Sequence, residues 1–199
     1  SKMGQLGGRA AVYYIATTLD GFIARPDGSF ADFPWDDAFI ATLRERFPET
    51  LPAPMRPAAT RAENRRFDAV LMGRQTYEVG SQQGLTSPYP TLDQYVVSST
   101  ISDLDPAVTV VDGDPAALAR RLKAEDGLGV WICGGSALAT PLFAAGLVDR
   151  LVVKVAPVVF GDGIPLFRGE VRRSLTLVDR TVFDSGYSLN EFLVDNDPA

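Results

Sequence analysis

VLMGRQTYE, residues Val70–Glu78, is the stretch that decides the fold, because it joins an apolar strand to a helix through a single glycine. The apolar run stops at Gly73, and Arg74 and Thr76 follow where the helix is expected to start, at about Thr76. Glycine lets a ligand approach the backbone closely, and the first turn of a helix carries unpaired N–H groups that attract phosphate. The stretch therefore predicts a strand, a turn and a helix, with an anion-binding site at the turn.

A second stretch repeats this arrangement. VWICGGSA, residues 130–137, also runs from an apolar strand through glycine into an expected helix. Ligands of open α/β sheets gather at the carboxyl ends of strands, so two such turns favour a phosphate site. Each turn alone is also ordinary strand-exit chemistry, and a lone arginine is often only a solvated charge. Ser98 and Ser99 follow a third expected strand, either as hydroxyl donors or as a plain cap.

The rest of the chain alternates strands with helices up to about residue 150. This alternation favours an α/β sheet covered on both faces, and the β-rich end of the chain indicates an antiparallel tail. Residues 9–195 are expected to form a single domain, and residues 1–8 a cloning remnant or disordered arm. The expected strands lie at 10–18, 69–72, 94–98, 108–111, 130–133, 149–160, 174–183 and 187–194, and the expected helices at 35–47, from about 76, at 115–126 and at 136–145.

Composition excludes several classes of function. The 199 residues carry a formal net charge of -6, which argues against a nucleic-acid or membrane-surface partner. No apolar run reaches the roughly 18 residues of a membrane span, so a soluble cytoplasmic protein is predicted. The sequence has no histidine, and Cys133 is its one cysteine. Histidine catalysis, an intrachain disulfide and a thiolate zinc site are therefore excluded, and no metal is expected.

Six motifs occur in a characteristic order along residues 10–194. They are AAVYYIATTLDGFIA (10–24), Pro34-Trp35, MGRQTYE (72–78), VSS (97–99), GGSAL (134–138) and APVVFGDGIPLF (156–167). Together they resemble dihydrofolate reductase and, more closely, the reductase domain of the bifunctional riboflavin biosynthesis protein. The resemblance implies a three-layer α/β fold: a mostly parallel eight-stranded sheet with an antiparallel end, flanked by about four helices.

The resemblance also implies NADPH as the hydride donor and a small-molecule substrate. Family members are often homodimers, so a homodimer is expected. Among the residues that the resemblance assigns to the cofactor, Ala16 and Ile23 meet the nicotinamide, Gly73, Arg74 and Thr76 hold the 2'-phosphate and pyrophosphate, Ser98 and Ser99 lie near the adenosine, and Gly134, Gly135, Ser136 and Ala137 form the pyrophosphate turn.

Two positions depart from the family pattern. Ile40 stands where dihydrofolate reductases carry the carboxylate that grips the pterin, and Cys133 stands where riboflavin enzymes commonly carry a glutamate. Asp36 and Asp37 lie close to Ile40, but their place in a first helical turn favours a capping role. Cys133 is expected to pack as a small apolar residue. Neither folate nor a riboflavin precursor is the expected substrate.

Three residues remain as candidates for the substrate side. Asp20 either donates a proton, or orients water, beside the nicotinamide, or it only closes an Asp-Gly turn. Trp35 and Tyr77 are candidates to line the substrate cleft, although we expect core packing for Trp35 and exposure to the cleft for Tyr77. The predicted function is an NADPH-dependent reductase of a heterocyclic or carbonyl-bearing molecule. The alternative is an NADP(H)-binding sensor that has lost catalysis.

Overall fold

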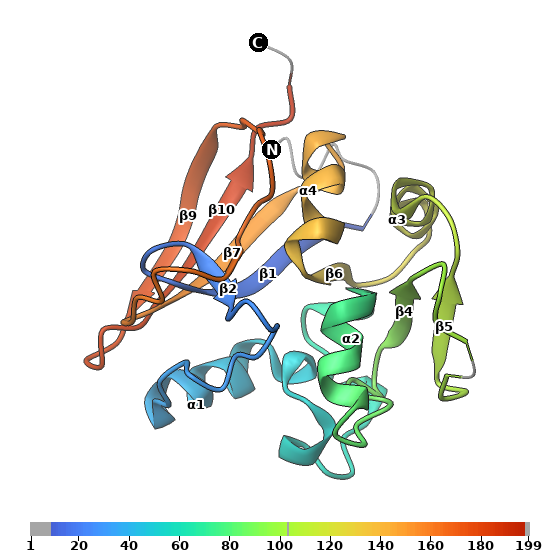
Figure 1. Ribbon diagram of the computed structural model, residues 1–199, viewed down its shortest axis with the longest axis horizontal. Coiled ribbons are helices and arrows are strands. Elements are labelled where there is room, and N and C mark those ends of the chain that lie inside the picture. Colours follow the sequence, from blue (N-terminus) through green and yellow to red (C-terminus); the bar gives the residue numbers. More distant parts are fainter. Residues whose placement is uncertain (1–8, 103, 198–199) are drawn as a thin grey trace.

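The computed structural model describes residues 9–102 and 104–197, and its centre is one sheet of eight strands (Figure 1). Its first six strands in spatial order run parallel to one another, and the last two pair antiparallel. The predicted parallel sheet with an antiparallel end is confirmed, and the prediction for residues 1–8 lies outside the described residues. In spatial order the strands are β5 (Val108–Val111), β4 (Asp93–Val97), β3 (Phe67–Gly73), β6 (Gly129–Gly134), β1 (Ala11–Thr18), β7 (Arg150–Ala156), β10 (Ser188–Val194) and β9 (Leu175–Val182).

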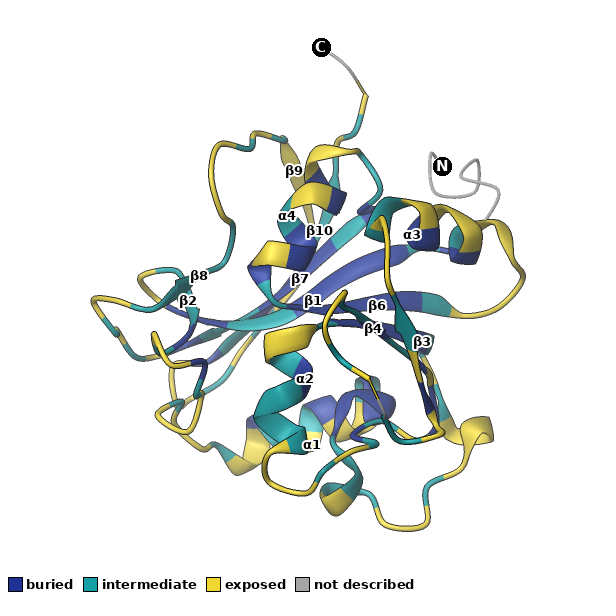
Figure 2. Cartoon of the chain, turned by 45° about the vertical axis from the view of Figure 1, so that its right-hand side comes forward, coloured by how far each residue is buried: buried dark blue, intermediate teal, exposed yellow. Residues whose placement is uncertain are grey.

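The helices cover both faces of this sheet. The helices α1 (Asp37–Arg46) and α2 (Arg74–Ser81) pack on one face, and α3 (Pro115–Ala124) and α4 (Ser136–Ala144) pack on the other. Each pair closes a separate buried cluster against the central strands, which are dark blue in Figure 2. None of the helices in the described part of the chain has the length and apolar character of a transmembrane segment. The smaller elements are the 3-10 turns Pro48–Thr50, Ala53–Met55 and Arg61–Glu63 and a two-stranded ribbon of β2 (Phe22–Ala24) and β8 (Ile164–Pro165).

The helix N-termini divide into capped and uncapped ends. Asp36 caps α1 by accepting from the N–H of Ala38 at 2.9 Å, and Asp114 caps α3 in the same way through Ala116 at 2.9 Å. In contrast, α2 and α4 follow Gly73 and Gly135 and have no side-chain cap. The capping role expected for Asp36 is confirmed.

Helix α2 starts two residues earlier than the sequence predicts. Gly73 is still paired with Val97 of β4, and its extended backbone (φ -72°, ψ 164°) makes it the N-cap of α2. Arg74 is therefore the first helical residue, and the expected start at Thr76 is wrong. The physical reason is that the strand pairing extends to the glycine and leaves no intervening loop.

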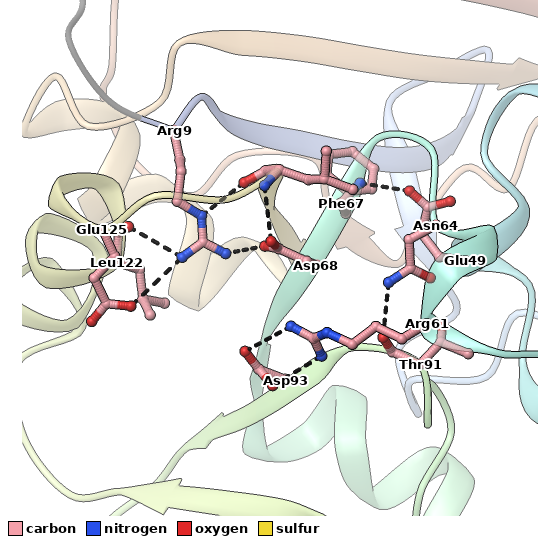
Figure 3. A network of polar contacts seen from close by, with 11 residues as sticks. Arg9, Glu49, Arg61, Asn64, Phe67, Asp68, Thr91, Asp93, Leu122 and Glu125 are labelled. Atoms are coloured by element: carbon pink, nitrogen blue, oxygen red, sulfur yellow. Dashed lines mark hydrogen bonds and ion pairs between the residues drawn. The ribbon is translucent and has the colours of Figure 1, made fainter.

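A polar network fixes the opposite, amino-terminal end of β3 (Figure 3). The buried carboxylate of Glu49 accepts hydrogen bonds from the backbone N–H groups of Arg65, Arg66 and Phe67 at 3.1, 2.6 and 2.5 Å. Asp68 is ion-paired with Arg9, which brings the start of β1 to the same point. These contacts set where β3 begins, and the strand length then sets the position of Gly73.

A buried carboxylate also stabilises the antiparallel end of the sheet. Glu191 on β10 binds Arg66 through two hydrogen bonds of 2.9 and 2.8 Å and is ion-paired with Arg150. Burial by itself raises the pKa of Glu191, but the hydrogen bonds and charges of the two arginines outweigh it, and the net pKa lies below the usual value. Glu191 is therefore a structural anion.

Candidate functional site

The predicted cofactor residues follow consecutive parallel strands. Strands β4, β3, β6 and β1 are neighbours in the sheet and share one direction, so their carboxyl ends meet at one edge. The register joins Val97 to Gly73 and Met72 to Gly134. This edge thus collects Ala16, the turn 73–76, Ser98 and Ser99, and the turn 134–137.

The two glycine turns touch one another. A Cβ atom added at Gly73 would lie 3.6 Å from the carbonyl oxygen of Gly134 and 3.7 Å from the nitrogen of Gly135. A Cβ at Gly135 would lie 3.4 Å from Cδ1 of Ile23 and 3.6 Å from Oγ1 of Thr76. Gly134 has φ 103°, a conformation that favours glycine. Thr76 and Ile23 therefore border the same turn.

This arrangement fits a ligand with two adjacent phosphates. Two neighbouring helices begin here without a side-chain cap, and each presents the positive end of its dipole and unpaired N–H groups. The same chain caps α1 and α3 with aspartates. The missing caps at α2 and α4 leave room and hydrogen-bond donors for an anion.

Two arginines lie beside these helix starts. Arg74 is exposed, and its guanidinium is ion-paired with Glu78 at 2.9 Å, one turn along α2. Arg168, which our sequence reasoning missed, donates from Nε to the hydroxyl of Ser136 at 3.1 Å. Its backbone N–H also donates to Thr140 on α4 at 2.9 Å. Arg168 lies just after the motif APVVFGDGIPLF, and that position was the only signal available in the sequence.

Ser98 takes part in a turn. Its hydroxyl oxygen accepts from the N–H groups of Thr100 and Ile101 at 3.1 and 3.2 Å, and its own N–H donates to Val111 at 3.0 Å. This geometry favours the plain-cap interpretation of Ser98. Ser99, which is exposed, follows at the same strand exit.

Asp20 connects two loops. Its carboxylate accepts from the hydroxyl of Thr18 at 2.6 Å and from the N–H groups of Phe160 and Gly161 at 3.1 and 2.7 Å. The hydrogen bond from Thr18, with those from the two backbone groups, holds the pKa of Asp20 below its usual value. A carboxylate stabilised as an anion is a poor proton donor, so the geometry favours the structural interpretation.

The expected exposures of the two aromatic candidates are both wrong. Trp35 is 67% exposed, because it precedes the cap of α1 and so lies off the apolar face of that helix; its Nε1 donates to Asp37 at 2.7 Å. Tyr77 is 2% exposed and faces the sheet, and its hydroxyl donates to the carbonyl oxygen of Thr86 at 2.8 Å. Tyr77 therefore belongs to the core beneath α2.

The two residues that depart from the family pattern lie in apolar surroundings. Ile40 packs against the buried cluster under α1. Cys133 is buried, and burial raises the pKa of its thiol to about 12. A thiol in this state stays protonated at neutral pH and acts as a packing residue.

A surface pocket of about 370 Å³ lies elsewhere, among residues of α1 and the proline-rich segment that follows it. It contains none of the predicted site residues. We therefore take the strand-end edge as the candidate site. The pocket is lined by Arg44, Pro48, Met55, Arg56, Pro57, Ala58, Ala59 and Glu63.

Solved structures with this fold include riboflavin biosynthesis proteins. A putative riboflavin biosynthesis protein from Shewanella sp. PV-4 superimposes with a TM-score of 0.68 at 23% identity, covering 94% of this chain and 99% of that one. The diaminohydroxyphosphoribosylaminopyrimidine deaminase/5-amino-6-(5-phosphoribosylamino)uracil reductase of Thermotoga maritima gives a TM-score of 0.63 at 17% identity, covering 94% of this chain and 57% of that one. RibD of Acinetobacter baumannii gives a TM-score of 0.62 at 15% identity, covering 98% of this chain and 60% of that one. These likenesses show the fold.

Sequence relatives occur in Bacillus subtilis (strain 168). The uncharacterised protein YwjB is 34% identical over 160 residues, which are 80% of this chain and 83% of YwjB. The uncharacterised protein YyaP is 26% identical over 195 residues, which are 89% of this chain and 91% of YyaP. The sequence pattern of the RibD C-terminal domain matches residues 10–189. The chain therefore belongs to the family of the RibD C-terminal domain.

Proposed function

We propose that this protein is an NADPH-dependent reductase of a small heterocyclic or carbonyl-bearing molecule. The observation that carries the proposal is the pair of adjacent, uncapped helix starts at Gly73 and Gly135, with Arg74 beside them. Membership of a family named for a riboflavin-biosynthesis protein supports a reductase. NADPH, when bound, supplies the hydride.

The chain's own residues would hold the cofactor along the strand ends. Backbone N–H groups at the starts of α2 and α4, with the Thr76 hydroxyl, bind the pyrophosphate. Arg74 binds the 2'-phosphate as a fixed cation, and this contact distinguishes NADPH from NADH. Ala16 at the end of β1 and Ile23 on β2 contact the nicotinamide.

The substrate is expected to differ from those of relatives that act on pterins or riboflavin precursors. Ile40 offers no carboxylate to grip a pterin, and Cys133 replaces the family glutamate. The substrate class that remains consistent with these two apolar side chains is a small carbonyl or heterocyclic compound.

Titration of the protein's fluorescence with NADPH and NADH tests the proposal, followed by turnover assays on small aldehydes, ketones and pterins. We expect NADPH to bind more tightly than NADH. Thr76→Val, which removes one hydroxyl, should weaken both cofactors equally, because both carry the pyrophosphate. Absence of binding to either cofactor would refute the proposal.

The second candidate function is a sensor that binds NADP(H) without catalysis. Two observations favour it: Ile40 supplies no acid, and the carboxylate of Asp20 is held by the loop at 160–161. Tight NADPH binding without turnover of any compound in the panel would support this alternative.

We also propose that the protein is a homodimer that pairs through β9. This edge strand is exposed along almost its whole length, and it exposes Leu175, Leu177, Val178 and Val182 by 40, 50, 43 and 68%. A long apolar edge strand invites pairing with another strand, and a second copy of the chain would cover it.

A further inference from the structure

Lys154 is a charged residue in the middle of an apolar strand. It lies on β7, which runs between β1 and β10 (Figure 1), and it is paired in register with Ala16. Val152 and Ala156, two residues to either side, belong to the cluster under α1 and α2. Because side chains alternate along a strand, Lys154 also points to that face. Its Nζ lies 3.9 Å from the centre of the Tyr14 ring.

The ammonium group of Lys154 has no hydrogen-bond or ion-pair partner among residues 9–102 and 104–197. The titratable groups around it are the thiol of Cys133 on β6, Tyr14 on β1 and, beyond Cys133, Tyr89 from the segment before β4. On the neighbouring β10 it faces the apolar Leu189. No carboxylate of the described residues neutralises this half-buried charge, although it stands within an apolar strand.

The carboxylates on or next to the elements around this face already have other partners. Asp20 is bound to the loop at 160–161, Asp36 caps α1, Glu49 binds the start of β3, and Glu191 binds Arg66 and Arg150. Lys154 is half-buried, so part of its side chain remains accessible. The structure thus holds a cation, with a free hydrogen-bonding capacity, directly beside the strand residue that is expected to contact the nicotinamide.

We propose that Lys154 is the proton donor of the reductase and that the substrate presents a carbonyl oxygen to its ammonium group. This inference rests on the proposed function and adds to it the acid and the substrate class. Hydride addition to the carbonyl carbon moves the C=O π pair onto oxygen, and that oxygen takes a proton from Nζ. The carbonyl is reduced to an alcohol, NADPH is oxidised to NADP+, and the neutral amine recovers a proton from solvent.

The chemistry of Lys154 suits this role, and that of its neighbours does not. Burial lowers the pKa of Lys154 to about 8. An acid with a pKa close to the working pH transfers a proton efficiently. The Cys133 thiol, whose pKa is about 12, is too weak an acid, and Asp20 is held as an anion.

A nuclear magnetic resonance titration tests the position of Lys154 without any substrate. Lysine occurs only at positions 2, 123 and 154, so lysine labelled at Cε gives few signals. Lys123, held by Asp149 at 2.7 Å, is the internal control. We expect the Lys154 signal to titrate near pH 8 in the free protein. Its midpoint should be lower with NADP+ than with NADPH, because the oxidised nicotinamide carries a positive charge.

Kinetics of two variants test the chemistry. With any aldehyde or ketone that the protein reduces, Lys154→Met should lower kcat by at least about 100-fold, the typical contribution of a positioned acid. Lys154→Arg keeps the cation but releases its proton poorly, so KM should be retained while kcat falls. Both variants should bind NADPH within about twofold of the wild type, and the wild-type kcat should decline as pH rises through about 8.

The outcomes separate this inference from the proposed function. If the wild type binds no NADPH, the proposed function fails and the role of Lys154 fails with it. If NADPH binds but Lys154 titrates at the ordinary value of about 10.4 in every state, only the role of Lys154 is overturned. The same holds if Lys154→Met reduces a carbonyl compound at the wild-type rate. If no compound in the panel is reduced, the nuclear magnetic resonance titration with NADPH and NADP+ decides whether Lys154 lies beside the nicotinamide.

Discussion

Replacement of Arg74 by alanine should weaken NADPH binding and leave NADH binding unchanged. A charge-assisted hydrogen bond to a phosphate contributes about 1.5 to 3 kcal/mol. Arg74 must first leave Glu78, and an exposed pair of this kind at i, i+4 contributes about 0.3 to 0.5 kcal/mol. The net loss is about 1 to 2.5 kcal/mol, which raises the dissociation constant of NADPH about 5- to 60-fold.

The ion pair supplies a second variant with the opposite sign. Glu78→Gln releases Arg74, so NADPH should bind about twofold more tightly. Arg61→Ala is the matched control, because Arg61 is another exposed arginine, bound to Asp93 at the opposite end of the sheet (Figure 3). Fluorescence titration with both cofactors gives all the constants. Equal loss of NADPH and NADH affinity in Arg74→Ala, or no loss, would show that Arg74 does not contact the 2'-phosphate.

Three further substitutions test the buried carboxylates and the edge strand. Glu49→Gln puts an amide NH2 against backbone N–H groups, so urea unfolding should show a free energy of unfolding lower by about 1 to 3 kcal/mol. Exposed Glu45→Gln is the control, and equal stability of the two variants would contradict the network. The folded-state pKa of Glu191 is lowered, so its stabilisation is complete above its unfolded pKa of about 4.3 and is lost as pH falls through the folded value. Glu191→Gln should therefore be less stable than the wild type at pH 7, and the difference in the free energy of unfolding should shrink below about pH 4. A difference that stays constant with pH would refute the assignment of Glu191 as an anion. Leu177→Glu should convert a dimer to a monomer in light scattering, and a wild type that is already monomeric contradicts the pairing of β9.

The order of strands and helices was predictable because local chemistry determines it. Apolar runs rich in β-branched residues gave the central strands, and Asp114 followed by Pro115 indicated the start of α3. The antiparallel tail followed from the absence of helices after residue 150. The start of α2 was not predictable, because the pairing of Gly73 with Val97 is a contact between strands.

Side-chain exposure around the site was harder to predict. Trp35 and Tyr77 exchanged their expected places, since the direction of the loop before α1 and the rotation of α2 about its axis depend on tertiary packing. Arg168 reaches Ser136 across 32 positions of the chain, and no local pattern reports that contact. Lys154 did leave a signal: a single lysine interrupts the apolar run LVVKVAPVV, and a charge within an apolar strand requires an explanation.

Gly73, the N-cap of α2, is a position where a substitution that stabilises the fold would impair the proposed function. Its backbone already has the extended conformation of an N-cap, and a Cβ there would meet its neighbours only at ordinary contact distances, the nearest at 3.6 Å. Gly73→Asp would thus supply the missing cap and gain only about 0.3 kcal/mol of stability, since glycine is itself a tolerated cap. The new carboxylate would stand where a phosphate is expected and repel it. Selection for heat resistance alone would favour such changes, so an engineering campaign on this scaffold must screen for ligand binding in every round.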